Sequence, residues 1–211
     1  AGSATAVIEH KNDIREILPD ASKQLVEALK DVDNLRAKAE QELNYCLQHD
    51  IQTLCMNDED YPQRLRECVD APLLLYFKGN TKLNARHTIN LVGTRHCTPY
   101  GQDIIRLFIK ELKALCTDVL IFSGLAYGVD IHSHRAALEN GFDTVGVLAH
   151  GLDDLYPRGH QETALKMIKQ GGLLTEYMTH TQPIARNFVQ RNRIVAGCSD
   201  ATILIESAAK G

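Results

Sequence analysis

Long apolar runs are absent from this chain, which excludes several classes of protein. No stretch among its 211 residues approaches the roughly 18 apolar residues that a membrane-spanning helix needs. The first residues also lack the positively charged and then apolar pattern of a secretory signal peptide. With 44% hydrophobic and 24% charged residues, the composition is that of an ordinary soluble globular protein. We therefore expect a cytoplasmic protein without a membrane partner.

Fingerprints of metal and cofactor binding are missing as well. The six cysteines form no Cys-x-x-Cys pair, and no histidine or cysteine neighbours have the partner spacing of a zinc site. The chain contains neither the Gly-x-Gly-x-x-Gly turn of dinucleotide-binding proteins nor the Gly-Lys-Ser/Thr ending of a Walker loop. We expect reduced thiols, no metal and no cofactor, and a nicotinamide enzyme or an ATPase is disfavoured.

The net charge of −4 is distributed unevenly along the chain. Residues 1–60 contain 13 acidic and 6 basic residues, whereas residues 61–211 contain 14 acidic and 17 basic residues. Attraction to phosphate depends on local basic patches, so the larger part can bind a nucleic acid despite the overall negative charge. The acidic part is then expected to face away from that ligand.

The spacing of apolar residues predicts helices in the first part of the chain and strands that alternate with helices in the rest. Residues 4–18 fit one short helix that ends at Pro19, and apolar residues from Leu25 to Cys46 fit one continuous helix. After strands at 51–55 and 71–77, helical segments separate five apolar strands, at 89–92, 119–122, 144–149, 173–177 and 201–206. This alternation indicates parallel pairing. We predict an α/β fold, a Rossmann-like doubly wound and mostly parallel sheet preceded by a small helical segment.

The same patterns divide the chain into three parts. We expect a partial helical domain of the SAM or helix-hairpin kind at residues 1–50, a bridge at 51–84 and a truncated Rossmann-like domain at 85–211.

Thr98-Pro99 is typical of a helix start, and Gly141 is typical of the residue just past a helix end.

Two glycine-containing loops follow the first two strands of the alternation. Gly93-Thr94-Arg95 follows one strand, and Ser123-Gly124 opens the loop after the next. Ligands of doubly wound sheets bind at the carboxyl ends of the strands, where backbone N–H groups, a hydroxyl and a guanidinium can converge on an anion. Two such cradles suit two successive phosphates of a nucleic acid or the phosphates of one nucleotide. The spacing of the two loops in the sequence does not distinguish these two ligands.

The segment Asn187-Phe188-Val189-Gln190-Arg191-Asn192-Arg193 concentrates arginine and amide side chains beside an aromatic ring. Guanidinium groups match phosphate oxygens and a phenylalanine face accepts an unpaired base, so the segment predicts contact with a single-stranded nucleic acid. The alternative is structural, because the arginines could instead pair with Glu176 and Glu206 and hold the loop. We favour this pairing for the two glutamates.

A nucleophilic triad of Ser123, Asp130 and His134 is disfavoured, because the chain lacks the Gly-x-Ser-x-Gly elbow. We expect Asp130 to cap the following helix and His134 to pack or hydrogen-bond beneath the loop. Tyr127 and Tyr156 could stack on a base or serve as partly buried anchors.

The order of the motifs closely resembles the DNA-processing protein A family, also called DprA or Smf. The resemblance covers essentially the whole chain. It rests on Tyr61-Pro62, Leu75-Tyr76-Phe77-Lys78-Gly79-Asn80, Val92-Gly93-Thr94-Arg95, Ser123-Gly124-Leu125-Ala126-Tyr127-Gly128-Val129-Asp130, Gly151-Leu152-Asp153, Tyr156-Pro157, Thr175-Glu176-Tyr177, the segment from Asn187 to Ile194, and Ile205-Glu206. It implies a homodimer that binds single-stranded DNA without known catalysis, protects incoming strands during natural transformation and helps load the RecA recombinase.

The resemblance also implies which residues bind DNA. They are Gly93, Thr94, Arg95, Ser123, Gly124, Arg186, Asn187, Phe188, Arg191, Asn192 and Arg193, with Arg186 as the additional basic residue. Met178 stands where members of the family often have proline. Since members of the family continue beyond the fifth strand of the alternation, we expect this chain to be a fragment.

Two other functions stay open at this point. In one, Glu206 and Arg193 beside an anion cradle would hydrolyse the glycosidic bond of a nucleotide. In the other, the acidic helices would be the main functional surface of a protein-interaction adaptor, and the sheet would be its scaffold.

Overall fold

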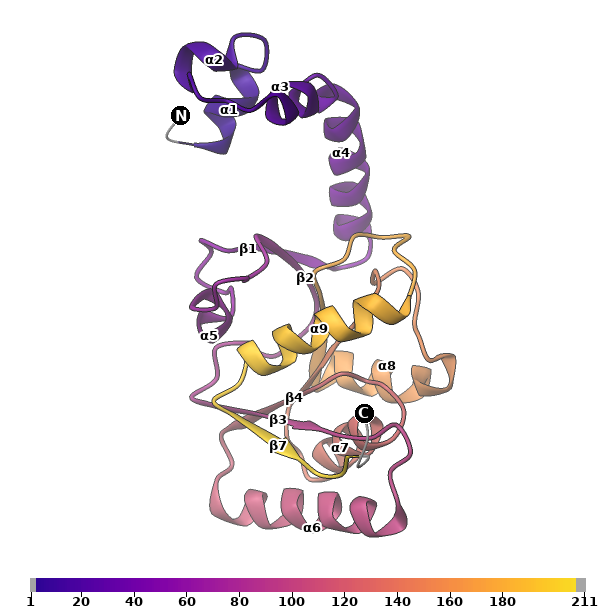
Figure 1. Cartoon of the computed structure of the whole chain (residues 1–211). Coiled ribbons are helices and arrows are strands. Elements are labelled where there is room, and N and C mark those ends of the chain that lie inside the picture. The colour runs from indigo at the N-terminus through magenta and orange to yellow at the C-terminus, as the bar shows by residue number, and fades with distance from the viewer. Residues whose placement is uncertain (1–2, 208–211) are drawn as a thin grey trace. The chain divides into compact units, whose positions relative to one another are not determined.

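A computed structural model describes residues 3–207 of the chain. It divides into two compact units, Ala1–His49 and Asp50–Gly211. The smaller unit contains helices α1 to α4, and the larger unit contains the sheet and the remaining helices (Figure 1). No helix within residues 3–207 combines the length and the apolar character that crossing a bilayer requires.

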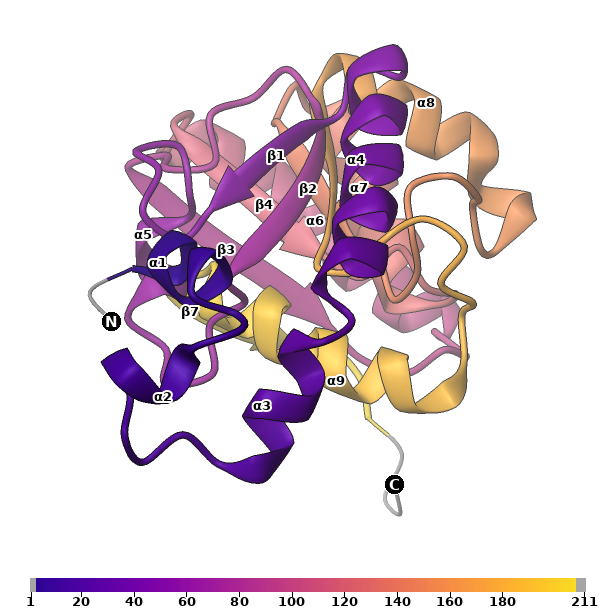
Figure 2. The ribbon, with the colours of Figure 1, turned by 90° about the horizontal axis from the view of Figure 1, so that it is seen from above.

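The larger unit is built on one seven-stranded sheet in the order β1-β2-β6-β5-β4-β3-β7. Its strands are β1 (Gln52–Cys55), β2 (Leu74–Gly79), β3 (His87–Val92), β4 (Val119–Ser123), β5 (Thr144–Val147), β6 (Gly171–Thr175) and β7 (Ala201–Leu204). β3, β4, β5, β6 and β7 pair in parallel, whereas β1 and β2 pair antiparallel and lie side by side at one end of the sheet (Figure 2). The mostly parallel Rossmann-like sheet is therefore confirmed, and β1 and β2 extend this same sheet.

Helices cover both faces of the sheet. They are α5 (Gln63–Arg66), α6 (Pro99–Leu115), α7 (Val129–Glu139), the short 3-10 helix η1 (Arg158–His160), α8 (Gln161–Lys169) and α9 (Ala185–Gly197). In Figure 1, α9 lies above the parallel strands and α6 and α7 lie below them. The expected helix limits are confirmed at two places: Thr98 caps α6 with Pro99 as its first residue, and Gly141 follows α7 with a φ of 68°.

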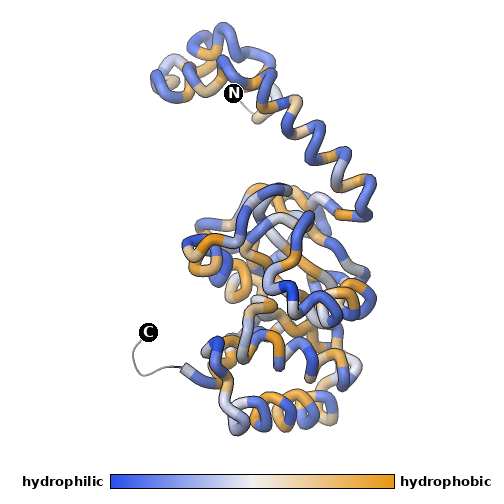
Figure 3. The backbone as a smooth tube through the Cα atoms, turned by 90° about the vertical axis from the view of Figure 1, so that its right-hand side faces the viewer, coloured by the Kyte–Doolittle hydropathy of each residue, from blue (hydrophilic) through white to orange (hydrophobic). Residues whose placement is uncertain are grey.

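Neighbouring residues of β4 belong to separate apolar clusters on opposite faces of the sheet. On the α9 face, Phe122 packs in one cluster with Ile194 and Val195. On the α6 face, Ile121 packs in another with Ile105 and Ile109. Figure 3 shows apolar and polar residues alternating along α6, the lowest helix, as expected of a helix with one buried face. The central strands β4, β5 and β6 are thus buried on both sides, and ligand access to them is left to the strand ends.

The smaller unit contains α1 (Ala4–Glu9), α2 (Ile14–Ile17), α3 (Lys23–Leu29) and α4 (Val32–Gln48). The prediction of one helix over 4–18 is wrong, because a turn from His10 to Asp13 separates α1 from α2. The prediction of one continuous helix from Leu25 to Cys46 is also wrong. The N–H groups of Lys30 and Asp31 bond three residues back, and α4 starts afresh after Asp31. Apolar spacing of three or four residues continues across such a short break, so the pattern alone did not reveal it.

An ion pair between Arg64 and Asp200 joins α5 to the start of β7. Nε and Nη2 of Arg64 donate to the two carboxylate oxygens of Asp200 at 2.5 and 2.9 Å, and the N–H of Thr88 donates to the same carboxylate at 2.8 Å. The hydrogen bond from Arg64 is the main cause that lowers the pKa of Asp200 from its ordinary value of 3.8. The pair therefore stabilises the fold above that pH and loses its contribution as the pH falls through the lowered pKa.

We predict that Asp200→Asn lowers the free energy of unfolding by about 1 kcal/mol at pH 7, because the carboxylate is half-exposed and its charge-assisted bonds are partly screened. Urea denaturation measures this, and the difference from the unsubstituted chain is expected to shrink below pH 3.8. The control is Asp103→Asn, which breaks the exposed pair with Arg106 on α6 and is expected to cost less than about 0.5 kcal/mol. An equal loss for the two variants would contradict the assignment.

Candidate nucleic-acid interface

A cavity of about 140 Å³ lies where β3 and β4 end, between the loops that follow them and α9. It is lined by Val92, Gly93, Arg95, Gly124, Ala126, Tyr127, Asp130, Phe188, Val189, Arg191, Asn192 and Val195. The two loops and the α9 segment, far apart in the sequence, therefore meet at one place, as the rule for doubly wound sheets predicts. We call this cavity the strand-end pocket.

The two loops are in direct backbone contact. Val129 N–H, at the start of α7, donates to Thr94 O at 3.1 Å. At Gly128, which has a φ of 76°, an added Cβ would lie 2.2 Å from Thr94 O. Only glycine permits this approach together with this backbone conformation. The close contact explains why the second loop ends in glycine.

Several of the predicted phosphate contacts already have partners inside the protein. Ser123 is fully buried, and its hydroxyl donates to Leu91 O at 2.7 Å. The N–H of Thr94 donates to Glu206 O at 2.8 Å, and that of His96 donates to the Thr94 hydroxyl. The first bond holds the loop against the segment that follows β7, and it occupies the Thr94 amide that was expected to bind a phosphate.

Arg191 forms the floor of the pocket. Its side chain is only 3% exposed. Its Nη1 donates to Gly124 O at 2.5 Å and also to Val147 O, so one guanidinium holds the ends of β4 and β5 together. An added Cβ on Gly124 would lie 2.4 Å from that guanidinium, which explains the glycine there.

Asp130 is the buried counter-charge of this arginine. Burial raises the pKa of Asp130, and the charge of Arg191 opposes that shift. Burial likewise lowers the pKa of Arg191, against the effect of Asp130. Asp130 does not cap α7 as expected. It sits in the first turn and accepts a bond from Ala126 N–H at 3.3 Å, because Gly128 occupies the cap position.

The outer wall of the pocket is aromatic and cationic. The guanidinium of Arg95 lies over the Phe188 ring at 5.4 Å from its centroid, and the Tyr156 ring meets Phe188 edge to face at 5.8 Å. Arg95, Tyr127, Tyr156, Pro157 and Phe188 surround a further small hollow of about 50 Å³. Arg95 is exposed, so its guanidinium is accessible from solvent. We call this second space the aromatic hollow.

The other predicted residues of α9 divide by their side of the helix. Asn192 lines the pocket and is exposed, and Arg186 is exposed near the start of the helix. Asn187 is buried and donates to Ala149 O and Gln182 O. Arg193 lies outside the pocket lining, where it pairs with Glu176 and donates to Asp70 O at 2.8 Å.

The predicted carboxylate pairing is confirmed for one glutamate and wrong for the other. Glu176 pairs with Arg193. The carboxylate of Glu206 instead accepts bonds from the N–H and hydroxyl of Thr98 at the start of α6. His134 packs beneath the loops as expected: it is fully buried, it bonds to Thr144 Oγ1 at 2.7 Å, and burial lowers its pKa to about 3.

His160 is a residue of this region that the sequence patterns did not reveal. It is buried at the end of η1, and its Nδ1 bonds to Leu125 O in the second loop at 2.8 Å. Its ring also meets the Tyr127 ring edge to face, with centroids 4.9 Å apart. The two residues are 33 positions from each other, so only the tertiary structure brings them together.

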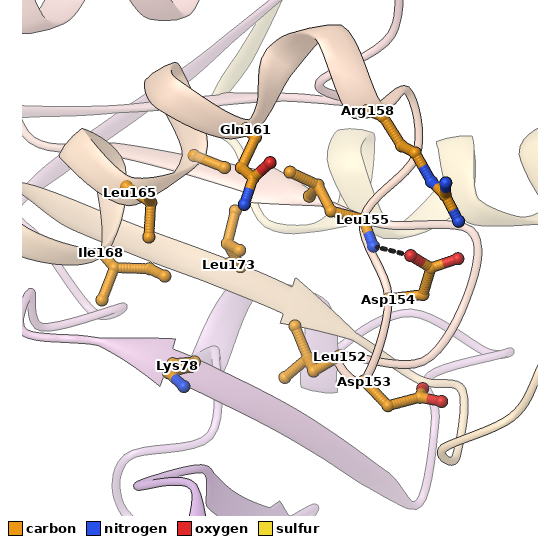
Figure 4. A pocket seen from close by; sticks show the side chains of 11 residues that line it. Lys78, Leu152, Asp153, Asp154, Leu155, Arg158, Gln161, Leu165, Ile168 and Leu173 are labelled. Carbon is orange, nitrogen blue, oxygen red and sulfur yellow. Dashed lines mark hydrogen bonds between the residues drawn. The ribbon is translucent and has the colours of Figure 1, made fainter.

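A larger cavity, of about 480 Å³, lies away from these loops. Figure 4 shows it between α8, β6 and the connection after β5, with leucine and isoleucine side chains inside and Lys78, Asp154 and Arg158 at its rim. Asp153 also lines this cavity, so the positive charges of Lys78 and Arg158 are balanced by two carboxylates. It therefore lacks the excess positive charge that a phosphate chain requires, and the smaller strand-end pocket is the better candidate.

The sequence matches the family described as DNA recombination-mediator protein A over residues 52–211. The chain belongs to this family. The DNA processing protein DprA of Streptococcus pneumoniae is 37% identical over 150 residues, which cover 71% of this chain and 52% of that protein. DprA of Bacillus subtilis is 35% identical over 161 residues, which cover 76% and 54%. The chain thus spans about half the length of these relatives.

Solved DprA structures have the same fold. The X-ray structure of Streptococcus pneumoniae DprA superposes with a TM-score of 0.80 at 31% identity, and it covers 95% of this chain and 68% of that one. DprA of Helicobacter pylori superposes with a TM-score of 0.67 at 31% identity, covering 76% and 71%. The latter structure is described in terms of its mode of single-stranded DNA binding. The family description names a recombination mediator and no chemical reaction.

We predict that Gly128→Ala lowers the free energy of unfolding by about 1–3 kcal/mol, because alanine is strained at a φ of 76° and its Cβ would collide with Thr94 O. The control is Gly159→Ala in η1, where no atom lies within 4 Å of the added Cβ. This variant is expected to keep its stability or gain up to about 1 kcal/mol. Urea titration of both variants checks the contrast, and equal stabilities would refute the close contact.

Proposed function

We propose that the larger unit binds single-stranded DNA, independently of sequence, at the strand-end pocket and the aromatic hollow. The observation that carries the proposal is the arrangement of Arg95, Phe188 and Tyr156. An exposed guanidinium stands against aromatic rings at the mouth of a pocket with a second, buried arginine as its floor. A phosphate and its neighbouring unpaired base require such a combination of charge and ring. The described DNA binding of the Helicobacter pylori relative supports it.

The aromatic rings at the mouth of the two spaces favour a single strand over a duplex. In a duplex both faces of each base are stacked and its pairing edge is occupied, so the rings at the pocket mouth would have no base to contact. A duplex could use only the charge of Arg95, Arg186 and nearby groups, and its binding is expected to be weaker.

In the cell, this binding would serve recombination of incoming DNA during natural transformation. We propose that the protein protects the strand in the cytoplasm, helps load the RecA recombinase onto it and works as a homodimer. Membership of a family of recombination mediators supports this role. The division of charge is consistent with it, because the acidic residues 1–60 would not approach DNA closely.

The nucleotide-hydrolase alternative loses its support. It requires Glu206 and Arg193 together beside the anion cradle. The carboxylate of Glu206 is used by Thr98, and Arg193 is paired with Glu176. Neither residue lines the strand-end pocket. We therefore propose binding without catalysis.

We predict that Arg95→Ala weakens binding to single-stranded oligonucleotides by about tenfold, whatever their sequence, because a charge-assisted bond to phosphate is lost. The slope of log affinity against log salt is expected to fall by about 1. Fluorescence anisotropy at several salt concentrations measures both effects. Arg106→Ala, which removes an exposed arginine of α6, is the control and is expected to bind normally. A loss confined to certain base sequences would refute the phosphate assignment.

We predict that Phe188→Leu weakens binding by roughly tenfold and leaves the salt slope unchanged, because it removes ring stacking and no charge. The same anisotropy titrations measure it. Tyr100→Leu serves as its control, since Tyr100 is an exposed aromatic residue of α6 outside both spaces. A change of slope without a change of affinity at low salt would contradict base stacking by Phe188.

A further inference from the structure

The aromatic hollow has two walls that come from different parts of the chain. Tyr127 belongs to the loop after β4, whereas Tyr156 and Pro157 belong to the connection that follows β5. Both tyrosines are about half-exposed. Exposed rings on separate loops can drift apart unless a buried group ties the loops together, so the width of the hollow depends on such a link.

His160 is placed to be this link. It ends η1, which begins directly after Pro157, so it belongs to the Tyr156 wall. Its Nδ1 reaches Leu125 O in the other wall at 2.8 Å, and its ring contacts the Tyr127 ring edge to face. Since a carbonyl only accepts, the bond requires the proton on Nδ1. The ring is 4% exposed, so water does not compete for this bond.

Leu125 has a backbone conformation that needs support from its surroundings. Its φ is 58°, a left-handed conformation that is sterically unfavourable for a leucine. Its side chain is fully buried in the cluster with Leu148 and Met167. The core thus fixes the side chain, and His160 holds the carbonyl. Together they set the direction in which the chain leaves toward Ala126 and Tyr127.

We propose that His160 is a positioning residue for nucleic-acid binding: it locks the second loop in its left-handed conformation and sets the spacing of the Tyr127 and Tyr156 walls around an unpaired base. It touches neither phosphate nor base. The effect on DNA affinity rests on the proposed function. The loop geometry it describes can be measured without DNA.

Two amide variants test the role of Nδ1. The amide nitrogen of His160→Asn falls near the position of Nδ1 and can still donate to Leu125 O, whereas His160→Gln carries its amide one methylene further out. We expect Asn to bind single-stranded DNA within about twofold of the unsubstituted chain and Gln to bind about three- to tenfold more weakly. The salt slope is expected to stay constant in both, because no phosphate contact is removed.

A fluorescent reporter tests the loop itself. The chain contains no tryptophan, so Tyr127→Trp introduces a single indole at the wall of the hollow. Without DNA, adding His160→Gln is expected to shift the emission to longer wavelength and lower its anisotropy, and adding His160→Asn is expected to leave both nearly unchanged. Thermal denaturation of each variant establishes that the compared chains are folded.

The outcomes distinguish a failure of the positioning role of His160 from a failure of the proposed DNA binding. Identical emission for the Asn and Gln variants overturns the positioning role, as does an equal loss of affinity that follows an equal loss of thermal stability. If the unsubstituted chain does not bind single-stranded DNA, the proposed function fails, and the emission comparison alone decides whether His160 sets the loop.

Discussion

The buried guanidinium of Arg191 organises the end of the sheet that holds the strand-end pocket. Removing a charge from water costs several kcal/mol unless it finds partners, and Arg191 finds them in the carbonyls of Gly124 and Val147 and in the charge of Asp130. Because these partners come from two strand ends and from α7, the bond network holds three elements in one arrangement. Loss of the arginine would leave Asp130 buried without its counter-charge, and α9 would lose one of its ties to the sheet.

Around this floor, roles are divided between inner and outer residues. The inner polar side chains donate hydrogen bonds to backbone carbonyls of the protein, so they shape the pocket. They are Ser123, Asn187 and Arg191. Arg95 and Phe188, at the mouth, have an exposed guanidinium and a half-buried ring to offer. A rigid inner layer with a few accessible groups lowers the cost of ordering side chains when a flexible strand binds. DNA contact by the whole predicted set stays a prediction, and the outer members are its strongest candidates.

Gly128 and His160 fix the backbone of the loop that follows β4. Gly128 lets the two loops touch, and His160 ties the second loop to the connection after β5. Leu125 between them carries a left-handed backbone that its buried side chain and its bonded carbonyl maintain. The aromatic hollow therefore depends on residues that line no part of it, which links the packing of α8 and η1 to the proposed contact with an unpaired base.

The sequence by itself determined the parallel strands of the sheet, the helix limits at Thr98 and Gly141, the meeting of two glycine loops and the family, but it assigned β1 and β2 to a bridge rather than to the sheet. These features depend on local periodicity, on turn chemistry and on motifs that are contiguous in the chain. It did not determine which arginine faces solvent. Arg191 and Arg193 are two positions apart, yet one is buried under the pocket and the other pairs with Glu176 on another side of α9. That outcome depends on how the helix lies on the sheet, as does the contact of His160 with Leu125, and only long-range packing decides both.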